Sequence, residues 1–126
     1  MRLRPDALTA AQRAYESEMR DIGQVMRCET TEDSYGAPVE SYVAGERIPC
    51  MFSFLSATER ATLDPTYSVM VGRARLPLGT DVTRRDRFRV LERFGKTLVR
   101  PREFAIMGEP RETAAYLMLE LSEVGA

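Results

Sequence analysis

Few side chains in this sequence of 126 residues belong to the types that carry out acid–base or nucleophilic chemistry. The chain has no histidine, so neither Cys28 nor Cys50 has a candidate base, and neither has the companions of a zinc site. Asp81 and Asp86 flank a polar segment, but their spacing matches no pattern of metal ligands, and we interpret the segment as a solvated loop. No motif places two carboxylates in a shared site. We therefore expect a protein that is not an enzyme, binds no small-molecule substrate and needs no metal or cofactor.

The cysteines and the hydropathy pattern bear on the compartment. Two cysteines separated by predicted turns do not make a disulfide framework, and we expect both to stay reduced and to fill space as small apolar side chains. No stretch approaches the roughly 18 apolar residues of a membrane-spanning helix, and the N-terminus lacks the apolar core of a signal peptide. These features predict a cytoplasmic protein without a membrane partner.

Charge is unevenly distributed along the chain, although the formal net charge is only -1. The segment from Arg73 to Arg102 holds ten basic and three acidic residues, a net charge of +7, whereas residues 1–72 and 103–126 each carry -4. Acidic and basic surfaces on one small domain suit head-to-tail or ring assembly, because self-association needs complementary fields on different patches. The alternative is that these side chains form ordinary solvated strand faces, where charge pairs contribute little.

A helix followed by strands is predicted from the spacing of apolar residues. Thr9 and Gln12 form a capping box that predicts a helix over residues 10–20, with Gly23 as its stop. From Gln24 the apolar period changes to two, which is typical of strands. The chain is thus divided into a helical extension, residues 1–23, and a β domain, residues 24–126.

The β domain is predicted from short apolar segments separated by turn residues. Strands are expected at residues 24–29, 39–43, 48–55, 67–76, 87–93, 97–99 and 104–107 with a break at Pro101, and 114–122, and turns at residues 33–36, 45–46, 77–79, 94–96 and 108–110. The expected core includes Phe52, Phe54, Leu117, Leu119 and Leu121. The predicted fold class is mainly β: a small antiparallel β-barrel of six to seven short strands with an N-terminal α-helix.

Arginines interleaved with aromatic residues suggest a second function. Residues 87–89 (Arg-Phe-Arg) and 93–96 (Arg-Phe-Gly-Lys) partly match the stacking surface of a barrel that binds single-stranded nucleic acid. Strand alternation, however, places Phe88 on the face opposite Arg87 and Arg89, where we expect it to belong to the core. A small OB-like β-barrel that binds single-stranded nucleic acid is therefore the alternative function.

The order of these signals resembles the head-closure proteins of long-tailed bacteriophages and gene transfer agents, also called head–tail joining or stopper proteins. The resemblance covers residues 24–122. It rests on residues 28–36 (Cys-Glu-Thr-Thr-Glu-Asp-Ser-Tyr-Gly) running into 39–43 (Val-Glu-Ser-Tyr-Val), on residues 56–60 (Ser-Ala-Thr-Glu-Arg), and on the segments 67–76, 86–90, 104–108 and 116–121. The N-terminal helix departs from the family pattern, in which the chain often starts close to the first strand.

The resemblance implies a β-barrel without catalytic residues that assembles as a homo-oligomeric ring at the head–tail interface of the virion. Its implied partners are the portal and adaptor proteins above and the tail terminator or other tail proteins below, with assembly in the cytoplasm of the bacterial host. Stopper, adaptor and tail-completion roles all agree with these signals. Candidates for a subunit interface, or for phosphate contacts with DNA in the channel, are Arg73, Arg75, Arg84, Arg85, Arg87 and Arg89. The candidate loop that reorders on assembly contains Ser56, Thr58, Glu59, Arg60 and Asp64.

Overall fold

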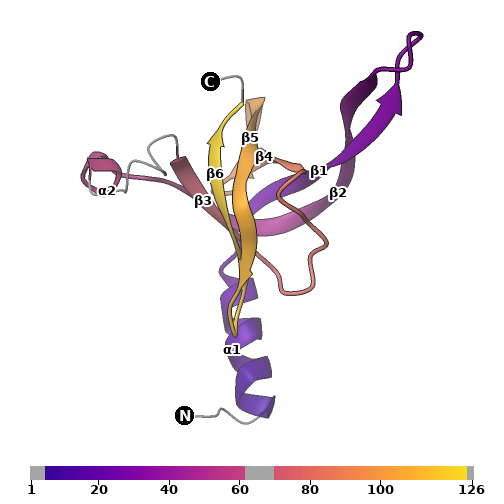
Figure 1. The fold of residues 1–126 in the computed structure, drawn as a ribbon. Helices are drawn as coiled ribbons and strands as arrows, with labels where there is room; N and C mark the ends of the chain where they lie inside the picture. Colours follow the sequence, from indigo (N-terminus) through magenta and orange to yellow (C-terminus); the bar gives the residue numbers. More distant parts are fainter. Residues whose placement is uncertain (1–4, 62–69, 125–126) are drawn as a thin grey trace.

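The computed structural model describes residues 5–61 and 70–124, and within these ranges six antiparallel strands form one closed barrel. The elements, in chain order, are α1 (Pro5–Ser17), β1 (Asp21–Glu32), β2 (Pro38–Phe54), α2 (Ala57–Ala61), β3 (Met70–Leu76), β4 (Arg87–Arg93), β5 (Lys96–Glu112) and β6 (Leu117–Glu123). The order around the barrel is β1-β2-β3-β6-β5-β4, and the pairing of β4 with β1 closes it (Figure 1). The predicted fold class, a mainly β barrel with an N-terminal helix, is confirmed. Neither described helix is long and apolar enough to cross a membrane.

The N-terminal helix starts earlier than its predicted cap. It begins at Pro5, and proline suits the first turn of a helix because its φ is already helical and its missing N–H is not needed there. Thr9 and Gln12 therefore lie within the helix, and the capping box predicted for them is wrong. Figure 1 shows α1 below the barrel, where Tyr15 packs on Tyr116 with ring centroids 4.6 Å apart. This contact anchors the helix on the segment that leads into β6.

Two glycines that the sequence assigns to a helix stop and a turn lie within strands instead. Gly23 belongs to β1, where an added Cβ atom would overlap the ring of Phe88. Gly45 belongs to β2, where an added Cβ atom would lie 2.9 Å from the carbonyl oxygen of Val25. The turn predicted at residues 45–46 is therefore wrong, and β2 is one strand of 17 residues. Both glycines permit close approach of neighbouring groups, a role that a single sequence does not distinguish from a turn.

β5 is also one long strand, although the sequence predicts interruptions at Pro101 and at residues 108–110. The pairing of β4 with β5 shifts register between Val90 and Glu92, which leaves Pro101 in an irregular stretch. Gly108, with a φ of 64°, and Pro110 lie in a second irregular stretch, where β5 pairs with β6. β-Bulges tolerate proline and glycine because a residue of the bulge is left without a ladder partner. The expected interruptions are therefore bulges within a continuous strand.

Two of the predicted turns are confirmed in detail. Phe94 and Gly95 connect β4 to β5 with φ values of 53° and 77°, the left-handed pair that a tight two-residue hairpin requires. Between β1 and β2, the Oδ1 atom of Asp33 accepts hydrogen bonds from the backbone N–H groups of Tyr35 and Ala37, at 2.8 Å and 2.9 Å. The first part of the strand predicted at residues 67–76 lies outside the described residues, and β3 covers the remainder.

The barrel interior holds one apolar core. Eight of its residues are at most 1% exposed: Cys50, Ala74, Leu76, Phe88, Val90, Phe104, Leu119 and Leu121. Phe52 is buried as predicted, and Leu117 packs half-buried against the core. Phe54, however, is 40% exposed, so its predicted burial is wrong. It is the last residue of β2, and its ring lies edge-on to that of Phe52 with centroids 4.8 Å apart. Phe52 is therefore the last residue of β2 whose side chain is buried in the core.

Candidate functional site

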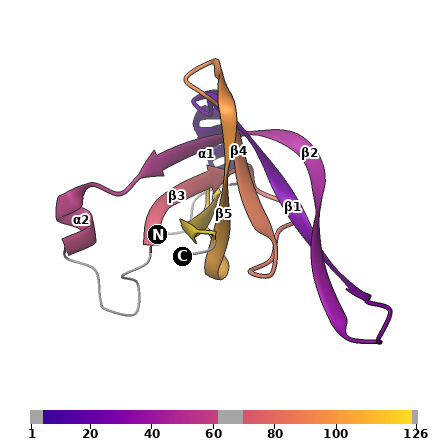
Figure 2. The same ribbon diagram turned by 90° about the horizontal axis from the view of Figure 1, so that it is seen from above.

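The hairpin formed by β1 and β2 extends well beyond the barrel, as Figures 1 and 2 show. Within the described ranges, β1 pairs with β4 only through Ile22–Met26, and β2 pairs with β3 only through Met51–Phe54. The outer part of the hairpin pairs only with itself, as far as Glu32 and Pro38. Its two outer edges therefore lack a strand partner, whereas the closed barrel has no free edge. We call residues 28–46 of this hairpin the acidic arm.

The acidic arm carries only negative charge. It contains no lysine or arginine and five exposed carboxylates: Glu29, Glu32, Asp33, Glu40 and Glu46. Apolar side chains are exposed on it too, because Tyr35 at the tip is 94% exposed, and Val39 and Val43 are 43% and 47% exposed. The two valines lie four residues apart in β2, on the same face of the strand. The arm thus combines negative charge with apolar groups that the chain itself leaves uncovered.

Arg27 ties the root of the acidic arm to the loop that precedes β4. Its Nη1 atom lies 3.1 Å from Oδ2 of Asp86, and its Nη2 atom lies 3.0 Å from Oδ2 of Asp81. Asp86 is 3% exposed and also accepts the backbone N–H groups of Cys28 and Thr83, each at 2.9 Å. The interpretation of this segment as a solvated loop is therefore wrong for Asp86, although the Asp81 side chain is 86% exposed. Arg27 thus bridges Asp81 and Asp86, the two carboxylates whose spacing in the sequence matches no pattern of metal ligands.

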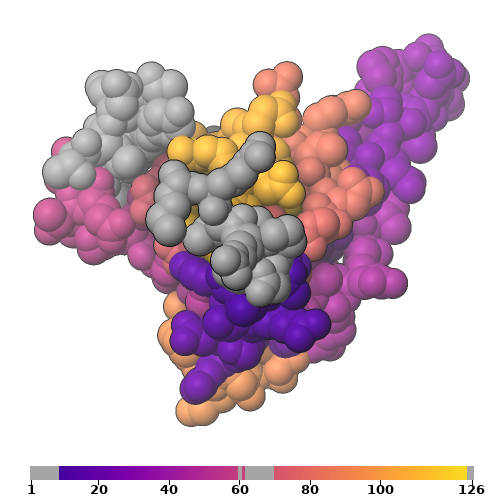
Figure 3. Space-filling view, turned by 90° about the horizontal axis from the view of Figure 1, so that it is seen from below, coloured from indigo at the N-terminus to yellow at the C-terminus, as the bar shows by residue number. Residues whose placement is uncertain are grey.

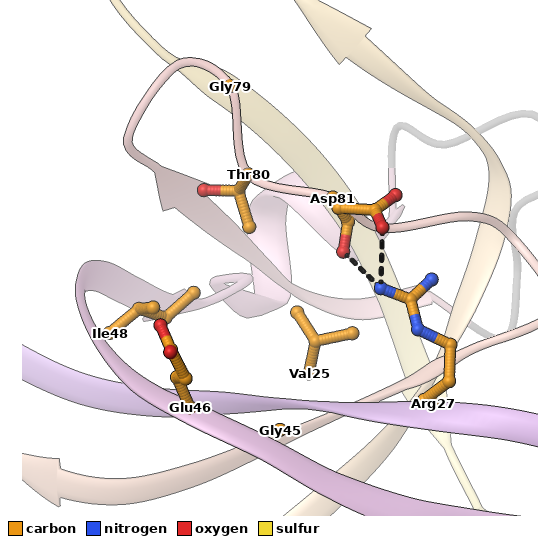
Figure 4. A pocket seen from close by; sticks show the side chains of 8 residues that line it. All are labelled: Val25, Arg27, Gly45, Glu46, Ile48, Gly79, Thr80 and Asp81. Carbon is orange, nitrogen blue, oxygen red and sulfur yellow. Dashed lines mark hydrogen bonds and ion pairs between the residues drawn. The ribbon is translucent and has the colours of Figure 1, made fainter.

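A pocket of about 290 Å³ lies beside this contact, between the loop and the two strands at the root of the arm. Figure 4 shows Thr80 and Asp81 on the loop, facing Val25 and Ile48 on the strands. The dashed lines mark the bonds from Arg27 to the carboxylate and to the carbonyl oxygen of Asp81. The shape of the pocket therefore depends on Arg27 holding the loop against the arm.

The six arginines predicted at an interface mostly pair within the chain. The ion pairs are Arg73 with Glu59 (3.4 Å), Arg84 with Glu109 (3.5 Å), Arg85 with Glu40 (3.9 Å), and Arg87 and Arg89 with Glu103 (3.3 Å and 3.0 Å). Arg75 lies over the ring of Tyr116 at 5.4 Å, and its buried Nε atom has no hydrogen-bond partner among the described residues. Much of the positive charge of this segment is therefore balanced internally.

These arginines do not form one patch. Arg85 reaches Glu40 of the acidic arm, and the guanidinium of Arg87 lies 4.1 Å from the ring centroid of Tyr42 on the same arm. Arg73, by contrast, pairs with a residue of α2. The structure thus brings Arg85 and Arg87 beside the arm, whereas Arg73 of β3 lies beside α2. Their role in assembly stays a prediction.

The candidate assembly loop begins with a capping box formed by Ser56 and Glu59. The Ser56 Oγ atom accepts the N–H of Glu59 at 3.1 Å, and Oε1 of Glu59 accepts the N–H of Ser56 at 3.2 Å. The bond from the Ser56 backbone, followed by that from its hydroxyl, lowers the pKa of Glu59 from the ordinary value of 4.5. Thr58 is exposed, Arg60 lies in α2, and Asp64 lies outside the described residues. The described half of this loop is therefore an ordered helical turn.

Sequence reasoning predicted the turn that connects β4 with β5 but did not single out this hairpin as a second charged surface. Residues 93–102, which we call the basic hairpin, contain four basic residues and no acidic one. The guanidinium of Arg93 lies 4.9 Å from the ring centroid of Phe94, 5.1 Å from that of Phe52 and 5.3 Å from that of Phe54. Its buried Nε atom has no hydrogen-bond partner in the described part of the chain. The signal in the sequence that could have indicated this surface is the Arg-Phe-Gly-Lys run at residues 93–96, in which the Phe94 ring contacts the guanidinium of Arg93.

No family model matches this chain, and no curated protein matches it. Among solved structures, the solution structure of protein SF1141 from Shigella flexneri 2a is similar, with a TM-score of 0.68 and 17% sequence identity. The match covers 85% of this chain and 94% of that chain. At this identity the likeness shows a shared fold. The fold of this chain therefore recurs over nearly the full length of the Shigella flexneri 2a protein.

Proposed function

We propose that this chain is a structural subunit of a head–tail connector, which forms a ring beneath the portal and its adaptor, closes the DNA-filled head and joins it to the tail. The order of sequence signals, which resembles that of head-closure proteins, supports this class of function. The structural observation that carries the proposal is the acidic arm. A closed barrel offers no strand edge to a partner, whereas the arm presents two unpaired edges and exposed apolar side chains.

The length of the acidic arm suits contact with a neighbouring subunit or with a connector protein above or below. The six residues of β1 beyond Met26 extend about 20 Å at the usual rise per residue of a strand. A two-stranded ribbon that packs on nothing is only marginally stable in water, so binding to a partner would stabilise it. Strand addition to a free edge is a common way to bind another protein. The arm is thus suited to assembly.

Contact with DNA in the channel is compatible with two of the predicted arginines. The side chains of Arg84 and Arg85 are 66% and 64% exposed, despite their ion pairs. Exposed pairs of this kind are weak and would exchange readily for phosphate contacts. Phe88, which the alternative function would need for stacking on bases, is 0% exposed. Phe88 is therefore not accessible for base stacking, whereas Arg84 and Arg85, in the loop that precedes β4, are exposed enough for phosphate contacts that do not depend on sequence.

The proposal is tested by deleting the gene and supplying the purified chain. Deletion should leave DNA-filled heads and separate tails, and the purified chain should restore joined particles, as counted by electron microscopy. Neighbouring genes should encode portal, capsid and tail proteins. Tailed, infectious particles made without the chain would overturn the proposal.

A shortened chain tests whether the acidic arm carries the function. Because β1 and β2 pair Glu29 with Ser41, residues 30–40 can be replaced by Asn-Gly with the register kept. The shortened protein should unfold in a single transition, like the parent, and should fail to join heads to tails. Full joining by the shortened chain would show that the arm is dispensable.

A further inference from the structure

The acidic arm and the basic hairpin point to different sides of the barrel. Seen from above, the arm extends to the lower right, while the hairpin between β4 and β5 rises at the top (Figure 2). The view from below agrees: purple residues of the arm lie at the upper right and orange residues of the hairpin at the bottom (Figure 3). One carries five acidic residues without a basic one, and the other carries four basic residues without an acidic one. A single copy cannot bring the two together.

Most of these charges have no ion-pair partner within the described part of the chain. On the acidic arm only Glu40 is paired, at 3.9 Å from Arg85, and both side chains are more than half exposed. On the basic hairpin only Arg102 is paired, at 3.7 Å from Glu123, again in an exposed position. The other carboxylates of the arm, among which Asp33 also caps the turn, form no ion pair with the described residues, and neither do Arg93, Lys96 and Arg100 of the hairpin. The two surfaces therefore present fields of opposite sign that the chain does not neutralise.

Both hairpins also expose apolar groups, which distinguishes them from ordinary charged surface. On the basic hairpin Phe94 is 73% exposed and Val99 is 98% exposed, and the acidic arm offers Tyr35, Val39 and Val43. The guanidinium of Arg93 is held among three phenylalanine rings with its Nε atom unsatisfied. A carboxylate is the group that such a fixed guanidinium binds best. Aromatic residues and arginine are enriched at the centres of protein interfaces.

We propose that the acidic arm of one copy of this chain docks on the basic hairpin of the next copy. The contact is heterologous, so each copy uses its arm towards one neighbour and its hairpin towards the other, as a ring requires. A symmetric dimer through either hairpin would place like charges together and is disfavoured. This inference rests on the proposed function, because the docking is the contact between neighbouring subunits of the ring. The basic surface used for self-association is then residues 93–102, and not the arginines that pair within the chain.

Charge reversal on each hairpin tests the docking. One variant carries Glu29→Lys and Glu32→Lys on the acidic arm, and the other carries Lys96→Glu and Arg100→Glu on the basic hairpin. All four residues are exposed, so both proteins should unfold like the parent. Sedimentation equilibrium at up to about 0.5 mM protein and about 50 mM salt, where screening is weak, should show the parent associating. Each variant alone should associate at least about tenfold more weakly, which corresponds to about 1.4 kcal/mol.

The decisive measurement is the association of a mixture of the two variants. The first variant keeps a basic hairpin and the second keeps an acidic arm, so an equimolar mixture should recover association through that pair. Matched controls with the same change in charge, Glu109→Lys with Glu112→Lys and Arg13→Glu with Arg20→Glu, alter exposed residues elsewhere and should associate like the parent. A parent that stays monomeric under these conditions, equal association of parent and variants, or no recovery on mixing would each overturn the docking.

The same variants separate this inference from the proposed function. If the parent joins heads to tails and both charge-reversed variants do so equally well, the connector role stands and the docking is wrong. If self-association depends on the two hairpins but the chain does not join heads, the docking stands and the connector role is wrong. If the variant of the basic hairpin loses affinity for DNA while its association is unchanged, the hairpin contacts nucleic acid and the docking is overturned.

Discussion

Arg27 and Asp86, which are 59 residues apart in the sequence, form an ion pair with Nη1 of the arginine 3.1 Å from Oδ2 of the aspartate. The side chain of Asp86 is 2% exposed, whereas that of Arg27 is 39% exposed. The buried carboxylate also accepts hydrogen bonds from the backbone N–H groups of Cys28, at the base of the acidic arm, and of Thr83, in the same loop as Asp86. This one side chain therefore joins β1 to the segment between β3 and β4. Asp86 thus contacts the acidic arm where the arm leaves the barrel.

Removing the carboxylate of Asp86 should be costly. Asp86→Ala leaves buried N–H donors and one guanidinium nitrogen without their acceptor, so we expect the free energy of unfolding to fall by about 2–4 kcal/mol. Asp81→Ala, at a side chain that is 86% exposed, is the matched control and should change it by less than about 0.5 kcal/mol. Denaturant unfolding of both variants measures the difference. Equal midpoints for the two variants would contradict a structural role for Asp86.

Gly23 should not tolerate a side chain, because the Phe88 ring occupies the space that a Cβ atom would need. We expect Gly23→Ala to destabilise the protein by about 1–3 kcal/mol through overpacking of the core. A double-mutant cycle with Phe88→Leu identifies the cause: the two losses should not add, because the smaller residue relieves the clash. Strictly additive losses would mean that backbone conformation, and not contact with the ring, fixes glycine at this position.

Local signals in the sequence predict the local structure well. The turn at Asp33 and the Phe94-Gly95 connection follow from residues that favour those backbone angles wherever they occur. The burial of Leu119 and Leu121 follows from alternation along a single strand. In each case the information lies within a few residues of the feature, and the prediction is confirmed.

Features set by distant parts of the chain could not be predicted in the same way. Gly45 serves close contact with Val25 on another strand, and Pro101 is tolerated because the ladder with β4 is irregular there. Neither the close contact at Gly45 nor the irregular ladder at Pro101 can be predicted from the residues adjacent in the sequence. The long strands were therefore expected to be shorter than they are.

The candidate site shows the same limit. A composition of ten basic and three acidic residues predicts a basic segment between Arg73 and Arg102, but not which charges remain free. Glu103, which lies just outside that segment, pairs with both Arg87 and Arg89 in the folded barrel. Arg93 of the basic hairpin, by contrast, is surrounded by phenylalanine rings and has no ion-pair partner among the described residues. Only the tertiary structure separates the two groups of arginines.

The capping box at α2 predicts a change in the pKa of Glu59. Its pKa is lowered by hydrogen bonds from the Ser56 backbone and hydroxyl, so Ser56→Ala should raise it towards the ordinary value of 4.5. A lowered pKa in the folded state means that the stabilisation is present above the unfolded pKa and is lost as pH falls through the folded pKa. Carboxyl titration by NMR measures the shift. Thr58→Ala, in the same helical turn, is the control, and an equal shift in both variants would exclude the cap as the cause.

The thiol of Cys50 should be unreactive in the native protein. Burial, with a smaller effect from the charge of Asp21, raises the pKa of the Cys50 thiol from 9.0 to about 12, and the thiolate is the reactive form. Cys28 is only half-buried, so at about pH 8 a thiol reagent should modify Cys28 first and reach Cys50 only as the barrel unfolds. Because the folded pKa is raised, the stabilisation is complete below pH 9.0 and is lost as pH rises from there towards about 12. Unfolding measured across this range should show the loss in the parent and not in Cys50→Ala. Rapid modification of both thiols in the folded protein would show that the core around Cys50 opens without global unfolding.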